Sequence, residues 1–370
     1  ADTADLGVRE FLLVRDNPPA ALPGAPGDML SPRFRSSDLY FLKYDADDGF
    51  LKVTDAEVDL DNAGDGDIAL VTTVNKTVTG EKEVHALTVR SGSGRTISDG
   101  GDGKLVVLSG GIGAYQTQSG ATTVNVLVQF GPDGAGVEGV LYSSGTSAFF
   151  PTLAEDVIAP EGLFKFGPGN FRIKPTGSDG SQHLGLRGRI TIVEGALMTD
   201  SGQRIFSSVE RFPNVTEMVL NGGAFAPEDD SLYSMPIVLG PNGGKFMVSS
   251  SAAAIVLNFD SDIQGPGSLV ITGMAAVYLN GSNTYTGGTW LNRVGGTVTV
   301  ASDSALGTGD VRLSGGTLAL RGQNINRNAS VVITGGTLAI RYFADFEVDS
   351  IIGTSAGSVS LGDSSGSGTA

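Results

Sequence analysis

The sequence predicts an all-β protein, a right-handed parallel β-helix with about 20 residues per coil. One observation is a fixed period, because Gly-Gly-Thr begins at Gly295, at Gly315 and again at Gly335. The other is that apolar residues alternate with small or polar ones after each Gly-Gly-Thr, which is the pattern of a strand with one buried face. A unit of this size has no core of its own, so its stability must come from stacking on its neighbours.

Each repeat unit predicts two short strands that meet at a glycine corner. Apolar residues recur in register before and after the corner, as Val311, Leu313, Leu318 and Leu320 in one unit and as Val331, Ile333, Leu338 and Ile340 in the next. Glycine suits the corner because it reaches positive φ without a Cβ clash. We therefore expect like residues to stack, each stabilising the stack by roughly 1.5–3 kcal/mol. A leucine-rich repeat would need a recurring Asn and a helical back side, and the sequence has neither.

Composition excludes several classes of protein. The 370 residues include 55 Gly and no Cys, which excludes a disulfide scaffold and cysteine–metal chemistry. The net charge of −16 argues against nucleic acid as a partner, since that needs clustered Lys and Arg. No apolar run approaches the ~18–20 residues of a membrane-spanning helix. The chain starts with Ala1 rather than Met, which we expect of a mature form after signal-peptide removal.

Four segments are expected along the chain. Residues 1–75, rich in Pro and Asp, are expected to form an irregular acidic N-terminal cap or arm. Residues 76–145 are expected to form the early β-helix coils. Residues 146–245, where many Phe residues occur at loose spacing, predict irregular coils with long loops or, alternatively, an inserted subdomain. Residues 246–370 predict the regular β-helix, cut through a coil at its C-terminus.

The regular segment carries a longer motif in residues 279–289, 295–309 and 311–318. These pieces, in this order, closely resemble the autotransporter-associated β-strand repeat, also called the passenger-associated transport repeat of type V secretion passengers. The resemblance covers residues 268–340 and departs from the usual pattern at Trp290, where a second Thr is common. The motif positions are Asn283, Tyr285, Gly287, Gly288, Thr289, Gly295, Gly296, Gly315 and Gly316.

The resemblance implies a secreted or bacterial cell-surface β-helix. In that family the passenger crosses the outer membrane through a β-barrel, which this sequence does not contain. The repeat bears on export and architecture and does not specify an activity. We expect a non-catalytic rod, acting as a stalk, an adhesin or a self-assembling fibre or layer subunit. The expected partners are copies of itself or a surface glycan or protein ligand.

Three residues near the motif are expected to serve packing. The side chain of Asn283 can bond the backbone of a tight turn at a corner. Tyr285 and Trp290 are expected to be exposed, as coil-packing or corner residues rather than sugar platforms.

An acidic run suggests a weak calcium site. Asp59, Asp61, Asp65 and Asp67 stand at nearly alternate positions, so that their oxygen ligands can converge on a hard cation. Leu70 stands where an EF-hand loop has Glu, so the match is partial. An acidic turn between strands is the alternative, and no other cofactor is expected.

A second group of residues suggests a ligand surface in the central segment. Phe149, Phe150, Glu228, Asp229 and Asp230 flank loops there and are candidates for lining a glycan groove. Parallel β-helices also include polysaccharide lyases and hydrolases, whose paired carboxylates act on a glycosidic bond. Polysaccharide binding or degradation is therefore the alternative function.

Overall fold

The computed structural model describes four short strands between residues 14 and 52 and, from residue 57, most of the chain. The described ranges are 57–91, 94–116, 122–144, 151–174, 182–199, 210–228, 230–248, 256–274, 276–300, 302, 304–321, 325–341, 346–354 and 356–362. These residues form strands and turns only. They include no helix that is both long and apolar enough to span a membrane.

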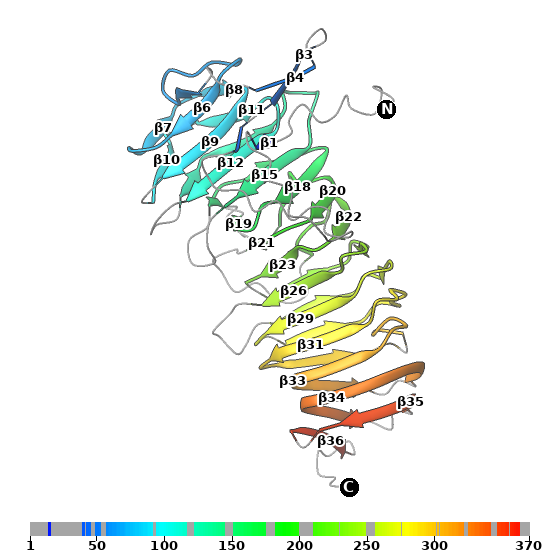
Figure 1. Cartoon of the computed structure of the whole chain (residues 1–370). Coiled ribbons are helices and arrows are strands. Elements are labelled where there is room, and N and C mark those ends of the chain that lie inside the picture. Colours follow the sequence, from blue (N-terminus) through cyan, green and yellow to red (C-terminus); the bar gives the residue numbers. More distant parts are fainter. Residues whose placement is uncertain are drawn as a thin grey trace.

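Parallel strands from successive turns stack into ladders that run along the molecule (Figure 1). One ladder is a ten-stranded sheet made of β5 (Glu57–Asp59), β6 (Ile68–Val71), β9 (Ala86–Ser91), β12 (Gly111–Gln116), β15 (Gly139–Ser143), β18 (Gly162–Phe166), β20 (Gly188–Ile192), β22 (Val215–Leu220), β25 (Ile237–Leu239) and β28 (Ile263–Gln264). A second ladder contains β7 (Lys76–Val78), β10 (Thr96–Asp99), β13 (Thr123–Asn125), β16 (Thr152–Leu153), β19 (Asn170–Ile173), β21 (Ala196–Thr199), β23 (Ala224–Pro227), β26 (Gly244–Val248), β29 (Leu269–Gly273) and β31 (Thr289–Val294).

Two further ladders complete the turns. The first is a four-stranded sheet of β8 (Glu81–Val84), β11 (Lys104–Val107), β14 (Leu127–Phe130) and β17 (Val157–Ile158). The second contains β24 (Ser231–Tyr233), β27 (Val256–Phe259), β30 (Ala276–Leu279) and β32 (Thr297–Val300). Near the C-terminus, β33 (Val311–Arg321) and β34 (Ile325–Arg341) each run through the corner and join both faces, and β35 (Phe346–Gly353) and β36 (Gly357–Gly362) follow them. The only antiparallel pairs in the described residues are β1 (Val14–Arg15) with β2 (Leu39–Tyr40) and β3 (Leu42–Asp45) with β4 (Gly49–Lys52).

The length of a turn varies along the stack. The Ile112–Leu141 pair joins residues 29 apart, whereas the Met218–Ile237 pair joins residues only 19 apart. From β33 to β34 the step is 20 residues on both sides of the corner, with a one-residue shift at Ser314. A turn takes about 23 residues on average, so the predicted β-solenoid is confirmed.

The predicted stacks form as expected around one continuous apolar core. Leu318 lies beside Leu338, and the core cluster extends without a break from Leu60 to Leu338. Gly316 and Gly336 turn the corner at φ of 72° and 81°, the left-handed region that glycine favours.

The structure bears on two of the predicted segments. Among the described residues, parallel stacking begins at β5, where Glu57 pairs with Ile68, so the predicted boundary between residues 75 and 76 falls inside the solenoid. The described part of residues 146–245 contains β16 to β26, all paired with neighbouring turns. These residues therefore form solenoid turns, and no inserted subdomain occurs among them. The predicted cut coil at 363–370 lies outside the described residues.

Candidate functional site

A buried lysine organises the acidic turn at the N-terminal end of the stack. Lys76 Nζ lies 2.5 Å from Asp59 Oδ1 and 2.8 Å from Asp61 Oδ2. The hydrogen bond to Asp59 is the main cause that raises the pKa of Lys76, and the same bond lowers the pKa of Asp59. The ammonium group therefore offsets part of the negative charge of this turn at neutral pH.

The remaining two predicted calcium ligands point elsewhere. Asp67 Oδ2 accepts the backbone N–H of Gly64 at 2.8 Å, and Asp65 is exposed to solvent. Within the described ranges, no three Asp, Glu or His side chains gather closely enough to hold a metal ion. Calcium binding stays a prediction, and a bound ion would have to displace the Lys76 ammonium. Thermal melting with and without EDTA tests calcium binding. An unchanged melting temperature would contradict the prediction.

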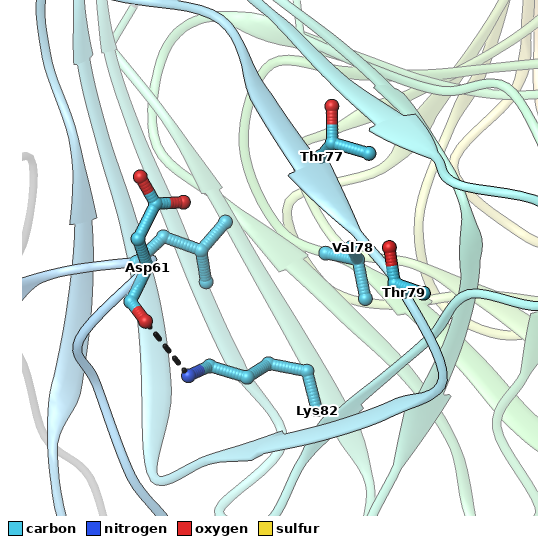
Figure 2. Close-up of a pocket in the computed structure, with 6 residues that line it drawn as sticks. Asp61, Thr77, Val78, Thr79 and Lys82 are labelled. Atoms are coloured by element: carbon cyan, nitrogen blue, oxygen red, sulfur yellow. Dashed lines mark hydrogen bonds between the residues drawn. The ribbon is translucent and has the colours of Figure 1, made fainter.

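A cavity of about 320 Å³ opens beside this turn (Figure 2). Its lining consists of Leu60, Asp61, Thr77, Val78, Thr79 and Lys82. The Lys82 ammonium donates to the backbone carbonyl of Asp61 at 3.4 Å. The two threonines are exposed, so their hydroxyls are available to a solute.

Lys82 occupies a position that belongs to the core in the following turns. It pairs with Leu105 in β11, which in turn pairs with Val128 in β14. Both of those side chains are fully buried. This column of the four-stranded sheet thus ends at a lysine, a charged residue that suits the end of a stack of strands.

The transport-repeat motif forms a corner that ties neighbouring turns together. Asn283 is buried; its Oδ1 accepts the Ile263 N–H at 2.7 Å and its Nδ2 donates to the Ala305 carbonyl at 2.5 Å. The predicted backbone role of Asn283 is confirmed. The side chain bridges the turn before and the turn after its own.

The two aromatic residues of the motif region differ in exposure. Tyr285 is fully buried, so the prediction that it is exposed is wrong, and its hydroxyl lies 2.5 Å from Thr289 Oγ1. That hydroxyl of Thr289 donates to the Leu306 carbonyl at 2.9 Å. Trp290 is exposed as predicted, and the Arg312 guanidinium lies 5.2 Å from the centroid of its ring.

The motif glycines allow close contact between backbones. A Cβ at Gly287 would lie 2.4 Å from the Gly267 carbonyl carbon, and one at Gly288 would lie 2.6 Å from the Asp310 carbonyl oxygen. The later corners, from Gly295-Gly296 to Gly315-Gly316 and beyond, hold the same place in consecutive turns. In this structure the motif residues are therefore packing residues.

The described members of the predicted ligand surface make structural contacts. Glu228 forms an ion pair with Arg172, and Asp230 Oδ1 accepts the backbone N–H of Val256 at 2.6 Å. Phe149, Phe150 and Asp229 lie outside the described residues.

Sequence reasoning missed a lysine buried in the lumen. Lys165 stands in a column between Leu141 and Ile192. Its Nζ donates to the carbonyls of Phe166, Gly167 and Glu194 at 2.8, 2.9 and 3.1 Å. Burial lowers the pKa of Lys165 to about 7, against the opposing effect of the Glu194 carboxylate. The alternation of β18 could have revealed it, because Lys165 follows Leu163 on the inward side.

A second buried polar group lies near the middle of the stack. The His183 ring stacks on Phe212, with centroids 5.1 Å apart. Burial, with a smaller effect from Arg211, lowers the pKa of His183 to about 3. The imidazole is therefore neutral at physiological pH and packs as an aromatic ring.

Comparison of the chain with protein-family models, curated proteins and solved structures finds no match.

Proposed function

We propose that the chain is a non-catalytic structural rod, exported to the cell surface or the medium, where it acts as a stalk, an adhesin or a subunit of a fibre or layer. The observation that carries this proposal is the unbroken stack of parallel turns from Glu57 to Gly362 around one core. Such a stack has a nearly constant cross-section, and each turn advances by about 4.8 Å. The shape suits a spacer that holds its two ends apart.

Four polar side chains that could serve catalysis have structural surroundings instead. The carboxylates of Asp59, Asp61 and Glu228 pair with basic side chains, and His183 is buried in the core. Export and surface location rest on the resemblance of residues 268–340 to the transport repeat.

Small-angle X-ray scattering of the purified chain tests the rod. We expect an elongated particle whose cross-section is constant along its length. A compact particle would contradict the proposal, and so would turnover of any acidic or neutral polysaccharide in a reducing-end or unsaturated-product assay. A heat-denatured sample of the same chain is the control for the turnover assay.

The cavity beside Asp61 favours glycan binding without turnover as a second candidate. Thr77, Thr79 and Lys82 offer two hydroxyls and an ammonium around a space of about 320 Å³, which suits a hydroxylated ligand with an acidic group. A glycan array would identify the ligand, and Lys82→Met should abolish its binding. Lys245→Met, at an exposed lysine in β26, is the matched control and should leave binding unchanged.

A further inference from the structure

We propose that the outer face of β29, β31 and β33 carries a binding site for an acidic glycan, in which Arg312 binds a sugar carboxylate and Trp290 holds the guanidinium in place. The three strands lie side by side in the regular part of the stack (Figure 1). The site goes beyond the proposed role as a rod. It is also separate from the cavity beside Asp61, which lies in the first turns.

The Arg312 guanidinium is held in position without being neutralised. Trp290 and Arg312 are paired across β31 and β33, and the guanidinium lies 5.2 Å from the centroid of the indole ring. Trp290 is 40% exposed, and Arg312 is exposed as well. Among the described residues the guanidinium has neither a carboxylate partner nor a hydrogen-bond acceptor. Its N–H groups can therefore form the paired hydrogen bonds that a guanidinium makes with a carboxylate.

The strands around Arg312 contain no acidic residue, although the chain as a whole is acidic. The chain has 40 Asp and Glu residues and a net charge of −16, yet neither type occurs in residues 269–273, 289–294, 311–314 and 331–334. The nearest acid along the chain is Asp310, whose Oδ1 accepts the backbone N–H of Ser330 at 3.1 Å. These strand segments carry only positive charge, which complements an anionic ligand.

Neutral hydrogen-bonding groups lie beside the guanidinium. Asn292 and Ser314 follow Trp290 and Arg312 by two residues, so they face the same way about 7 Å further along the strands. Both are exposed. Ser314 Oγ donates to the Leu291 carbonyl at 3.1 Å, which leaves its lone pairs to accept a proton. A positive charge beside amide and hydroxyl groups matches a ligand with many hydroxyls and sparse negative charge, as a polymer of uronic acids has.

Other anionic polymers match this face less well. Nucleic acid carries a charge on every nucleotide, and a chain of net charge −16 repels it. A peptide that binds by adding a strand needs an open sheet edge. No edge is open at Arg312, because β33 pairs with β31 on one side and with β34 on the other. A glycan needs no strand edge, since side chains alone can bind its carboxylates and hydroxyls.

The fluorescence of Trp290 reports directly on this site, because it is the only tryptophan in the chain. The probes are tetrasaccharides of galacturonic acid, of mannuronic acid and of hyaluronan, each titrated into the full chain with EDTA present. We expect a saturable change in fluorescence with at least one of them and none with neutral maltotetraose. No response to any of the three, or an equal response to maltotetraose, would overturn the proposal.

Variants assign the binding to Arg312. Arg312→Gln should weaken binding of the responding tetrasaccharide at least about tenfold in isothermal titration calorimetry, because it removes the charge and the paired donors. Arg312→Lys keeps the charge but loses the planar fork, so it should weaken binding less. Arg187→Gln, at another exposed arginine, is the control and should leave binding unchanged. Binding that survives Arg312→Gln and is lost in Lys82→Met would assign the ligand to the cavity and overturn the proposal.

The positioning role of Trp290 has its own test. Trp290→Ala should weaken binding in the same calorimetric assay, and Trp290→Phe, which restores a ring beside the guanidinium, should recover most of it. Equal affinities of Trp290→Ala and the natural chain would contradict this role.

Two further titrations separate a glycan from other polyanions. Oligothymidylate and oligoglutamate should bind at least about tenfold more weakly than the responding tetrasaccharide. Equal or tighter binding of either would make this a site for nucleic acid or for acidic peptides and would overturn the glycan assignment. None of these outcomes affects the scattering test of the rod.

Discussion

The irregular turns of residues 57–248 and the regular turns of residues 256–362 fill the same kind of lumen in different ways. In the regular turns every step is close to 20 residues and like residues stack in columns, as Leu318 does on Leu338. In the irregular turns the paired residues of neighbouring strands lie 11 to 29 residues apart. Aromatic rings then fill the lumen, as where Phe225 meets Tyr233 edge-on with centroids 5.1 Å apart.

The change from an aromatic to an aliphatic lumen occurs at a single contact. Phe246 in β26 and Phe259 in β27 stack with centroids 4.2 Å apart and an interplanar angle of 2°. Beyond Phe259, Tyr285 is the only fully buried aromatic residue among the side chains whose burial the structure describes. A constant turn length allows identical aliphatic side chains to fill each layer, whereas a variable one requires side chains of variable size and direction.

The largest expected effect tests the aromatic lumen. Phe212 is buried against His183, Phe225 and Tyr233, so Phe212→Ala should lower the free energy of unfolding by about 3–5 kcal/mol. Urea denaturation measures it. Phe164→Ala, at a half-buried outward-facing residue, is the control and should cost clearly less. A cost below about 1 kcal/mol for Phe212→Ala would mean that the aromatic residues do not support the irregular turns.

The next effect tests the polar bridge of the regular turns. Asn283→Ala would leave the buried Ile263 N–H and Ala305 C=O without partners, at a cost of roughly 2–4 kcal/mol. Asn280→Ala is a matched control in the same motif, since that half-buried side chain donates to the Asp260 carboxylate at 2.6 Å in a solvent-exposed hydrogen bond. Equal destabilisation by the two variants would refute a bridging role for Asn283.

A smaller effect tests the glycine corner. Gly336 has a φ of 81°, and a Cβ there would lie 2.5 Å from the Gly316 carbonyl oxygen. Gly336→Ala should therefore cost about 1–3 kcal/mol. At Gly353 an added Cβ would meet no atom within 4 Å, so Gly353→Ala should be nearly neutral. Differential scanning calorimetry of Gly336→Ala and Gly353→Ala measures the difference in stability. Equal melting temperatures of the two variants would contradict the corner geometry.

The last prediction concerns how the stability of the irregular turns depends on pH. Burial lowers the pKa of Lys165 to about 7 from an unfolded value of 10.5. Between these values the unfolded chain binds more protons than the folded chain, so stability should rise with pH, by up to about 1 kcal/mol for each pH unit. Below pH 7 both states are protonated and this contribution stays constant. Urea denaturation from pH 7 to pH 9 should show the rise in the natural chain and a flatter profile in Lys165→Met. Parallel pH profiles of the natural chain and Lys165→Met would contradict this role of Lys165.

Sequence pattern predicted the regular turns well because their register repeats. The stacks of Leu318 and Leu338 follow directly from a 20-residue period. The first strands, β5 and β6, were assigned to the cap because they lie in an Asp-rich run that resembles an irregular acidic segment. Lys165 was missed because a charged residue inside a lumen contradicts hydrophobic patterning, and only the three carbonyls that the fold brings together make it acceptable.

The candidate site was harder to predict than the fold. The spacing of Asp59 and Asp61 suggested a metal ion, whereas the structure places the ammonium of Lys76 between them. Lys76 lies in β7, outside the acidic run. The sequence of the run alone does not specify whether a metal ion or a lysine ammonium lies between its carboxylates. The cavity beside Asp61 likewise depends on how the turn after β5 meets β7 and β8.

The central claim is that the irregular and regular turns form one continuous rod, and a distance across their junction tests it most directly. An outward column runs through Lys245, Val270, Trp290, Arg312, Val332 and Ile352. Lys245→Cys and Ile352→Cys would give unique labelling sites, since the chain has no Cys. Five strand spacings separate them, or roughly 24 Å. Pulsed electron paramagnetic resonance, with labelled protein diluted in unlabelled protein, should give one narrow distribution near this distance. A broad or bimodal distribution reaching well beyond it would show that the two halves are hinged, and would contradict the rod.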